Sequence, residues 1–505
     1  MPALTLSETS SAWYASLRYP VINPANRKCS TVPIFSLNNQ YSRNFHLSWL
    51  GFFVAFLSWF AFSPLIPDVI KTDLNLTSEE VGNSNIVSLC STLIVRVISG
   101  PLVDRYGPRK VMAGLLIIGA IPSGLAGTVS TANGLYIVRF FIGILGATFV
   151  SCQAWNTVFF DKNVVGRANA LGGGWGNAGG GFTFIIMIAL FNQLLTDGMS
   201  PHVAWRVAFA IVPVPVLLSV AAATLMFGTD HPAGKWSDRY KAVAPALPAS
   251  DDQTIIINSA KNTNTKSGDD IETGGEKNIE VTITTINLVS ELDTAVNNPL
   301  SLDMAYEIML NPLTWLPSLA YMTTFGYELA IDANLATVLY TLLKSPTFGQ
   351  TKAGYIAGIY GLLNVFSRPL GGYFGDLIYV KFGVPGKKYL TIACGVAQGF
   401  LSFGLGLYID NHSHPSLAVI IVIFVILAIF NEVANGVNFS LVPHCNPNSN
   451  GFMTGIVGGM GNIGGILFAI IFRFEPSPSG KAFWISGVIA VSVNLLLCMI
   501  RVPQV

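Results

Sequence analysis

The chain is divided into about a dozen long apolar stretches, and this pattern limits its fold more than any other feature. A helix needs about 20 largely apolar residues to cross the hydrocarbon core of a bilayer. Hydrophobic residues make up 51% of the chain and charged residues only 11%, whereas a soluble domain normally carries about 25% charged residues. The sequence therefore predicts an all-α integral membrane protein.

Twelve transmembrane helices are expected. They cover residues 46–70, 81–103, 111–130, 134–160, 167–196, 203–227, 312–343, 350–375, 388–409, 416–440, 452–474 and 482–500. The chain is thereby divided into a tail (1–45), a first half (46–227), a polar linker predicted to be partly disordered (228–311), a second half (312–500) and a short end (501–505). Lysine and arginine concentrate in the loops that this topology places inside, which predicts that both termini are cytoplasmic.

Several functional classes find no support in the composition. A net charge of +1 gives no reason to expect a nucleic acid partner. The six cysteines form no CxxC pair, so neither a disulfide framework nor a metal site is expected. The chain has no Walker A motif and no hydrolase pair of carboxylates, so we expect no enzyme activity and no cofactor. Membrane lipid is the expected surrounding, and an oligomer is not required.

The two halves repeat each other. The second and eighth apolar segments both read R-x3-G-x3-D, starting at Arg96 and Arg368. The fifth and eleventh both read G-G-x-G-N-x-G-G, at residues 173–180 and 458–465. Such a match at six specified positions predicts two pseudo-symmetric six-helix halves, with a site at the interface between them.

Arg96 and Arg368 are the strongest candidates for this site. Placing an arginine inside the bilayer costs at least about 2.5–3.5 kcal/mol on insertion scales. The alternative is that each pairs with a buried carboxylate or reaches the membrane surface. Neither segment has an acidic residue on the membrane side of its arginine. Two symmetric guanidinium groups that face one cavity would bind a small planar anion. Arg139 is a third candidate, but it stands near a helix end, where a structural role is favoured.

The glycine-rich runs are expected to pack closely, because glycine lets helix backbones approach each other. Packing does not explain the asparagine inside each run, and Asn177 and Asn462 can donate hydrogen bonds to an anion. Acidic residues inside the apolar segments are candidate proton carriers, and they are Glu328, Asp332 and Glu432. The alternative is that each forms a salt bridge or lies at the membrane surface.

Two motifs resemble known ones. Residues 100–110 read GPLVDRYGPRK and resemble the loop motif of the major facilitator superfamily, with a degenerate copy at 371–388. The paired G-G-x-G-N-x-G-G runs resemble the signature of the nitrate/nitrite porter family within that superfamily. This resemblance covers residues 45–500. The long linker, which opens with TDHPAGK at 229–235, is similar to that of the fungal branch, whose members are high-affinity nitrate transporters.

The resemblance implies the major facilitator fold and a set of residues that bind the substrate. Arg96 and Arg368 match the family's anion clamp, and Asn177 and Asn462 match its signature asparagines. Gly173, in the same run as Asn177, belongs to the expected substrate-binding set. The resemblance also implies aromatic side chains around the anion, and these correspond to Phe149, Tyr321 and Phe325. Tyr327 is an alternative for the tyrosine.

The function implied by the resemblance is import of nitrate and nitrite across the plasma membrane by proton-coupled alternating access. Glu328 is the candidate for the proton-coupling residue. One alternative is nitrate/nitrite exchange, which some bacterial relatives perform, and another is a carrier for a different small anion. An alternative of another class is a nitrate sensor without transport.

Overall fold

The computed structural model describes residues 14–24, 26–161, 164–239, 301–445, 450–476 and 479–502. Residues 1–13 of the expected tail, 240–300 of the expected linker and 503–505 at the C-terminal end lie outside the described residues. Helices dominate the described part, whose only β-structure consists of isolated bridges. The predicted all-α fold is confirmed.

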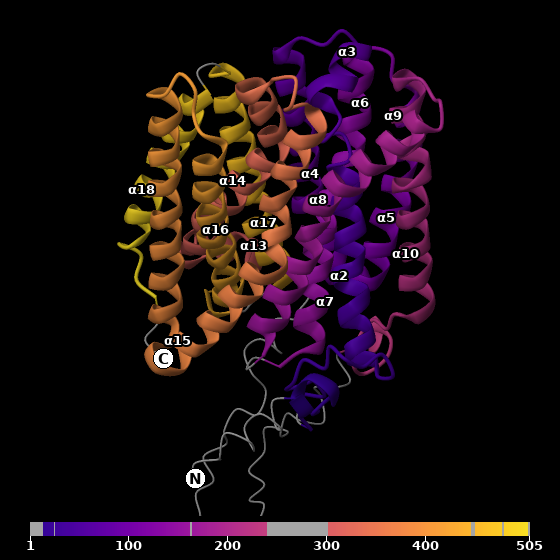
Figure 1. Cartoon of the computed structure of the whole chain (residues 1–505). Helices are drawn as coiled ribbons and strands as arrows, with labels where there is room; N and C mark the ends of the chain where they lie inside the picture. Colours follow the sequence, from indigo (N-terminus) through magenta and orange to yellow (C-terminus); the bar gives the residue numbers. More distant parts are fainter. Residues whose placement is uncertain are drawn as a thin grey trace, which may run out of the picture.

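Several long helices and two interrupted ones build the first half, coloured indigo to magenta in Figure 1. They are α2 (Gln40–Trp59), α4 (Ser78–Tyr106), α5 (Pro108–Leu125), α6 (Ala132–Ile142), α7 (Thr148–Phe159), α8 (Val165–Thr196), α9 (Pro201–Ile211) and α10 (Pro213–Phe227). A 3-10 turn at Gly143–Ala147 joins α6 to α7 within one crossing. A break at Val212, directly before Pro213, separates α9 from α10, because proline cannot donate the helical hydrogen bond.

The second half, coloured orange to yellow in Figure 1, contains one helix that crosses twice. Its helices are α13 (Leu302–Leu310), α14 (Pro312–Leu343), α15 (Gln350–Asp410), α16 (Leu417–Cys445), α17 (Asn450–Phe474) and α18 (Ser479–Leu497). Within α15, Gly383 has φ 62° and ψ −156° and reverses the chain direction. The loop expected between 375 and 388 is therefore reduced to a sharp turn at a glycine, the residue that tolerates positive φ.

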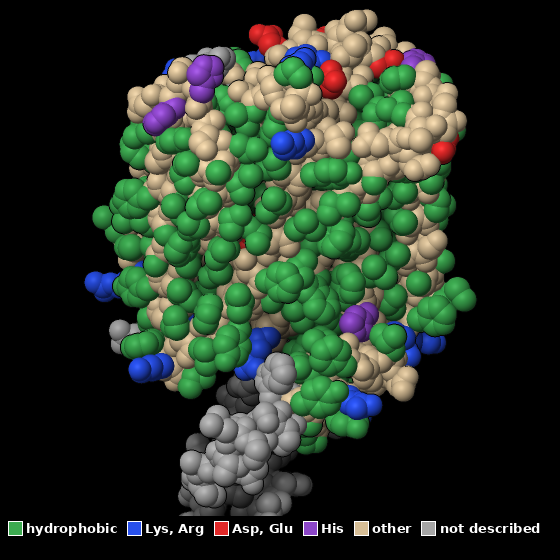
Figure 2. All heavy atoms as spheres, in the orientation of Figure 1, with side chains coloured by type: hydrophobic (Ala, Val, Ile, Leu, Met, Phe, Trp, Pro, Cys, Tyr) green, Lys and Arg blue, Asp and Glu red, His purple; other side chains and the backbone are tan. Residues whose placement is uncertain are grey.

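The crossings agree with a helical membrane protein. In the described residues, nine helical stretches are long and apolar enough to cross a membrane, and α15 is one of them. Counting α15 as two crossings and adding α2 and α14 gives the expected twelve. In Figure 2 hydrophobic side chains cover the middle of the visible face, and charged side chains gather toward its two ends.

Part of the expected tail and the start of the expected linker pack onto one end of the first half. The Cys29 backbone N–H donates to Phe159 O, and the Asp161 N–H donates to Cys29 O, both at 2.9 Å. The Trp236 indole N–H donates to Asp104 O at 3.0 Å. Because α2 already begins at Gln40, the ordered first half extends beyond the expected boundary at residue 46.

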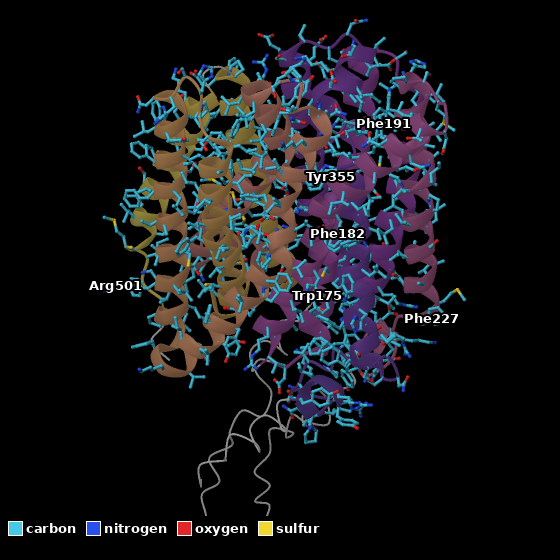
Figure 3. All side chains as sticks on the ribbon, viewed as in Figure 1. Trp175, Phe182, Phe191, Phe227, Tyr355 and Arg501 are labelled. Carbon is cyan, nitrogen blue, oxygen red and sulfur yellow. The ribbon has the colours of Figure 1, made fainter. Side chains whose placement is uncertain are left out.

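The halves meet where each signature helix packs against the arginine-bearing helix of the other half. A Cβ added at Gly181 of α8 would collide with the backbone of α15 at Leu362. A Cβ added at Gly459 of α17 would lie 3.5 Å from Val97 of α4. Phe182 of α8 and Tyr355 of α15 lie along this boundary in Figure 3. Within the runs themselves, a Cβ added at Gly174 would collide with Asn364 O of α15, and one added at Gly464 would collide with Met322 O of α14. Close packing therefore accounts for most glycines of the repeated runs, as expected.

Candidate functional site

Arg96 of α4 is fully buried and binds neutral groups. Its Nε donates to Gly146 O and its Nη1 to Gly458 O, both at 2.9 Å. Among the described residues, its Nη2 has no hydrogen-bond partner. The guanidinium carbon lies 5.0 Å from the ring centroids of both Phe149 and Phe325, within cation–π range. Arg96 thus reaches the interface between the halves, because Gly458 belongs to α17.

Arg368 of α15 is equally buried but has an acidic neighbour. Its Nη2 donates to the Tyr321 hydroxyl at 2.7 Å. Its Nη1 lies 3.9 Å from Glu328 Oε2 and has no hydrogen-bond partner within the described part of the chain. Sequence reasoning considered carboxylates only within the arginine's own segment, and the structure supplies one from α14. Arg368 therefore has a carboxylate within 4 Å, whereas the hydrogen bonds of Arg96 in the described part of the chain all go to backbone carbonyls.

The three expected aromatic residues form one stack between the arginines. Tyr321 and Phe325 lie parallel, with centroids 4.6 Å apart and an interplanar angle of 5°. Phe149 stacks at 6.0 Å from each of them. Phe439 of α16 packs edge-on against this stack, 4.9 Å from Phe149. Sequence reasoning missed Phe439, because nothing distinguishes it from the chain's other phenylalanines.

The tyrosine that lies against the arginine is Tyr321. Its hydroxyl accepts from Arg368. The Tyr327 hydroxyl instead lies 2.9 Å from the Ser402 hydroxyl, and its ring packs on Phe468. These two tyrosines are six residues apart on α14, so they face different neighbours.

Each signature asparagine donates to a group that lies beside the arginine of the other half. Asn462 donates to Gly458 O at 3.2 Å, and this oxygen also accepts from Arg96. Asn177 donates to Glu328, the carboxylate beside Arg368. The asparagine N–H groups are thus engaged by the protein, whereas we expected them to face an anion. Neither side-chain Oδ1 has a hydrogen-bond partner among the described residues.

The first glycine of each signature run lies against the opposing arginine. A Cβ added at Gly173 would lie 3.2 Å from Arg368 Nε. A Cβ added at Gly458 would lie 3.4 Å from Arg96 Cδ. Any larger residue at either position would crowd the guanidinium group, so these glycines leave room for the arginines.

Glu328 is the centre of a buried polar cluster. Its Oε1 accepts from Asn364 and its Oε2 from Asn435, each at 2.8 Å, in addition to the contact with Asn177. Sequence reasoning missed Asn364 and Asn435. The available signal was their amide groups inside apolar segments, with Asn364 one helical turn before Arg368.

Contacts between the halves enclose the site at both ends. At the end where the first half meets the linker, Arg167 of α8 pairs with Asp376 of α15 at 3.1 Å. At the other end, Gln350 Oε1 accepts from backbone N–H groups of the π-helical turn η1 (Ile66–Ile70), at 2.8 and 3.1 Å. Both central arginines are at most 1% exposed, so the site is closed to solvent in this arrangement.

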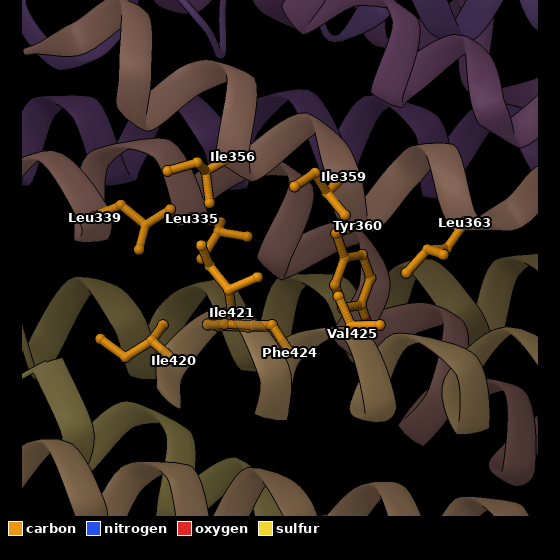
Figure 4. Close-up of a pocket in the computed structure, with 10 residues that line it drawn as sticks. All are labelled: Leu335, Leu339, Ile356, Ile359, Tyr360, Leu363, Ile420, Ile421, Phe424 and Val425. Atoms are coloured by element: carbon orange, nitrogen blue, oxygen red, sulfur yellow. The ribbon is translucent and has the colours of Figure 1, made fainter. Parts of the chain in front are cut away.

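A separate pocket in the second half does not suit an anion. It has an empty volume of about 310 Å³ and lies between α14, α15 and α16. Figure 4 shows its lining of aliphatic and aromatic residues, with Tyr360 at one side. The lining includes no charged side chain, so this pocket offers no cation to an anion.

Comparisons with known proteins agree with this architecture. Residues 48–503 match the family model of the Major Facilitator Superfamily. The chain is 32% identical over 494 residues to "High affinity nitrate transporter 2.5" of Arabidopsis thaliana, covering 97% of this chain and 86% of that protein. It is 27% identical over 469 residues to "Nitrate/nitrite transporter NrtP" of Nostoc punctiforme, covering 88% and 89%.

One solved structure shows the same fold. The crystal structure of the human organic anion transporter MFSD10 (TETRAN) has a TM-score of 0.52 at 14% identity, covering 91% of this chain and 100% of that one. At this identity the likeness concerns the fold alone. The family match and the nitrate-transporting relatives together give the assignment: this multi-pass membrane protein belongs to the major facilitator superfamily and, within it, to the nitrate/nitrite porter family.

Proposed function

We propose that the chain is a secondary active transporter that imports nitrate, and also nitrite, with protons across the plasma membrane, both termini being cytoplasmic. The anion is held between Arg96 of the first half and Arg368 of the second. The names of the relatives support nitrate as the cargo. The chemistry of the central residues supports a small planar anion.

One observation carries the proposal. Two buried guanidinium groups from opposite halves lie against the same aromatic stack, and each has one terminal nitrogen without a hydrogen-bond partner among the described residues. These nitrogens, Arg96 Nη2 and Arg368 Nη1, are free to donate to a ligand. Nitrate is planar with three oxygens, so it can accept from both sides while its face lies against the rings.

Alternating access follows from the enclosure of the site. We take the first half (46–227) and the second half (312–500) as the units that move, joined by the linker (228–311). The contact between Arg167 and Asp376 closes one end, and the contact of Gln350 with η1 closes the other. An anion between the arginines reduces the repulsion between their charges, which favours closure of the halves around it.

Glu328 is the candidate for coupling to protons. Its carboxylate lies 3.9 Å from Arg368 and competes with an incoming anion for that guanidinium. A proton on Glu328 removes this competition, so protonation and anion binding favour each other. Import of one nitrate with more than one proton carries net positive charge inward, and an inside-negative potential then contributes about 2.3 kcal/mol per charge per 100 mV.

Uptake of labelled nitrate in a strain that lacks its own carrier tests the proposal. We expect saturable uptake that nitrite inhibits and that falls as the external pH rises. Arg96→Ala should abolish uptake, while Lys381→Ala, which removes an exposed positive charge distant from the site, should leave it unchanged. Normal uptake by Arg96→Ala at wild-type surface levels would contradict the clamp. Binding without uptake would favour a sensor, and uptake that requires internal nitrite would favour an exchanger.

A further inference from the structure

A second carboxylate, Glu432, lies beside Glu328 in the membrane. Glu432 belongs to α16 and is fully buried. Within the described residues, neither of its carboxylate oxygens accepts a hydrogen bond from a donor. The flanking amides on α16 do not supply one, because Asn431 donates to Thr324 O at 2.9 Å and Asn435 donates to Glu328. An ionised carboxylate without donors is strongly disfavoured in such a place.

The ionisable groups around Glu432 come from two neighbouring helices. Glu328 of α14 faces the turn of α16 that carries Glu432, because Asn435 donates to Glu328 and Asn431 donates to Thr324 O, one turn before Glu328. Asp332, also buried, follows one turn further along α14. From α15, the positive charge of Arg368 attracts the Glu432 carboxylate, and Tyr360 lies within electrostatic range of Glu432. Two neighbouring buried carboxylates cannot both ionise readily, so the pair holds at least one proton in the arrangement seen here.

The two glutamates differ in the partners that stabilise their negative charge. Glu328 accepts from three amides and lies beside the Arg368 guanidinium. Glu432 has no such donors. This difference assigns the negative charge to Glu328 and the shared proton to Glu432 in the arrangement seen here. The two residues together can hold two protons.

The charges at the site show how two protons could accompany one nitrate. The site contains two guanidinium charges, on Arg96 and Arg368, and two carboxyl groups, on Glu328 and Glu432. With both carboxyls ionised, the site is neutral. With nitrate bound and both carboxyls protonated, the site carries one positive charge. A cycle between these two states moves two protons and one nitrate, with one net positive charge.

We propose that Glu432 is the second proton-carrying residue, which shares a proton with Glu328 and makes nitrate import electrogenic; this inference rests on the proposed function. When nitrate engages Arg368, the Glu432 hydroxyl transfers its proton to a Glu328 oxygen: the O–H bond breaks at Glu432 and forms at Glu328. Glu432 then takes a second proton from the water of the open side. On the other side both protons leave with the anion.

The test uses the full-length chain in proteoliposomes, with the membrane potential and the pH gradient set independently. For the wild type, we expect labelled nitrate flux driven by an inward proton gradient and increased by an inside-negative potential. Glu432→Gln should keep flux driven by the pH gradient but lose its response to the potential, because one proton fewer accompanies each nitrate. Glu432→Asp, which retains the acid, should restore that response. Glu307→Gln removes an exposed carboxyl and is the control.

Each outcome decides between the possibilities. If Glu432→Gln responds to the potential as the wild type does, the inference is wrong. If Asp332→Asn loses the response while Glu432→Gln keeps it, the second proton belongs to Asp332. If Glu432→Gln transports nothing, exchange of labelled nitrate at equal pH is measured: retained exchange supports the inference, and lost exchange overturns it in favour of a structural role. A wild type without proton coupling would contradict the proposed function itself.

Discussion

Arg96 and Arg368 occupy equivalent positions in the sequence repeat, yet their surroundings differ in charge. Each lies beside a group that accepts a hydrogen bond from the signature asparagine of the opposite half. For Arg96 and Asn462 this acceptor is a backbone carbonyl, Gly458 O. For Arg368 and Asn177 it is the carboxylate of Glu328. The acceptor beside Arg96 is therefore neutral, whereas the acceptor beside Arg368 can bind a proton.

This difference suggests different roles for the two arginines, whereas the sequence repeat alone would give them the same role. The Arg96 side offers a positive charge whose hydrogen bonds, within the described residues, go to backbone carbonyls. The Arg368 side offers a charge whose availability depends on the protonation of Glu328. In this account, Arg96 mainly attracts the anion, and Arg368 couples its binding to protons.

The largest expected effect tests whether the Arg368 side depends on charge compensation. Arg368→Ala removes the cation next to a buried carboxylate, and breaking a buried pair in this way costs about 3–5 kcal/mol of stability. We expect thermal unfolding of the purified chain at a clearly lower temperature. Arg368→Ala combined with Glu328→Gln should regain most of that stability without regaining transport. Arg96→Ala should unfold closer to the wild type, because it leaves no carboxylate uncompensated.

Lysine substitutions test whether the shape of the guanidinium matters on both sides. Arg96→Lys and Arg368→Lys retain the charge but lose the planar fork that donates to two oxygens at once. We expect nitrate KM to rise about 30- to 100-fold, equivalent to about 2–3 kcal/mol for charge-assisted hydrogen bonds. Unchanged KM in either variant would show that charge alone holds the anion on that side.

The asparagines offer a direct comparison of the two acceptors. Asn177→Ala removes a donor to a carboxylate, which costs about 1.5–3 kcal/mol, and Asn462→Ala removes one to a neutral carbonyl, which costs about 0.5–1.5 kcal/mol. We therefore expect Asn177→Ala to impair uptake more, and to change its pH dependence, whereas Asn462→Ala should leave the pH dependence intact. If the two variants have the same pH dependence of uptake, the proposal that only the Arg368 side couples to protons is wrong.

The smallest expected effect concerns the tyrosine hydroxyl. Tyr321→Phe keeps the ring stack but removes the acceptor 2.7 Å from Arg368 Nη2. The loss of about 1 kcal/mol predicts a roughly fivefold higher nitrate KM. Tyr327→Phe is the matched control, because its hydroxyl contacts Ser402 away from the arginines. If the control raises KM as much as Tyr321→Phe does, the role of Tyr321 in the site is not specific.

Sequence reasoning anticipated the fold. The repeat also predicted that Arg96 and Arg368 reach the interface between the halves, since equivalent positions in two symmetric halves converge there. That these residues and the signature asparagines bind an anion stays a prediction. The spacing of Tyr321 and Phe325, four residues apart, correctly predicted a shared helix face.

Contacts between distant segments could not be predicted in the same way. The ion pair of Glu328 with Arg368 depends on how α14 and α15 are rotated against each other. Helices that are apolar on most faces give no strong periodicity from which to read that rotation. For the same reason, the sequence did not show that Asn435 and Phe439 of α16 reach the site. Nor did it show that the Asn177 amide donates to a protein carboxylate. The sharp turn at Gly383 also lay outside the reach of hydropathy, which detects length and not backbone angles.

Equilibrium binding of labelled nitrate to the purified full-length chain tests the proposed anion site separately from transport. We expect saturable binding by the wild type and by Lys381→Ala. We expect loss of binding by Arg96→Ala, and by Arg368→Ala combined with Glu328→Gln, while both variants remain folded. Wild-type affinity in either folded variant would contradict an anion site formed by one arginine from each half.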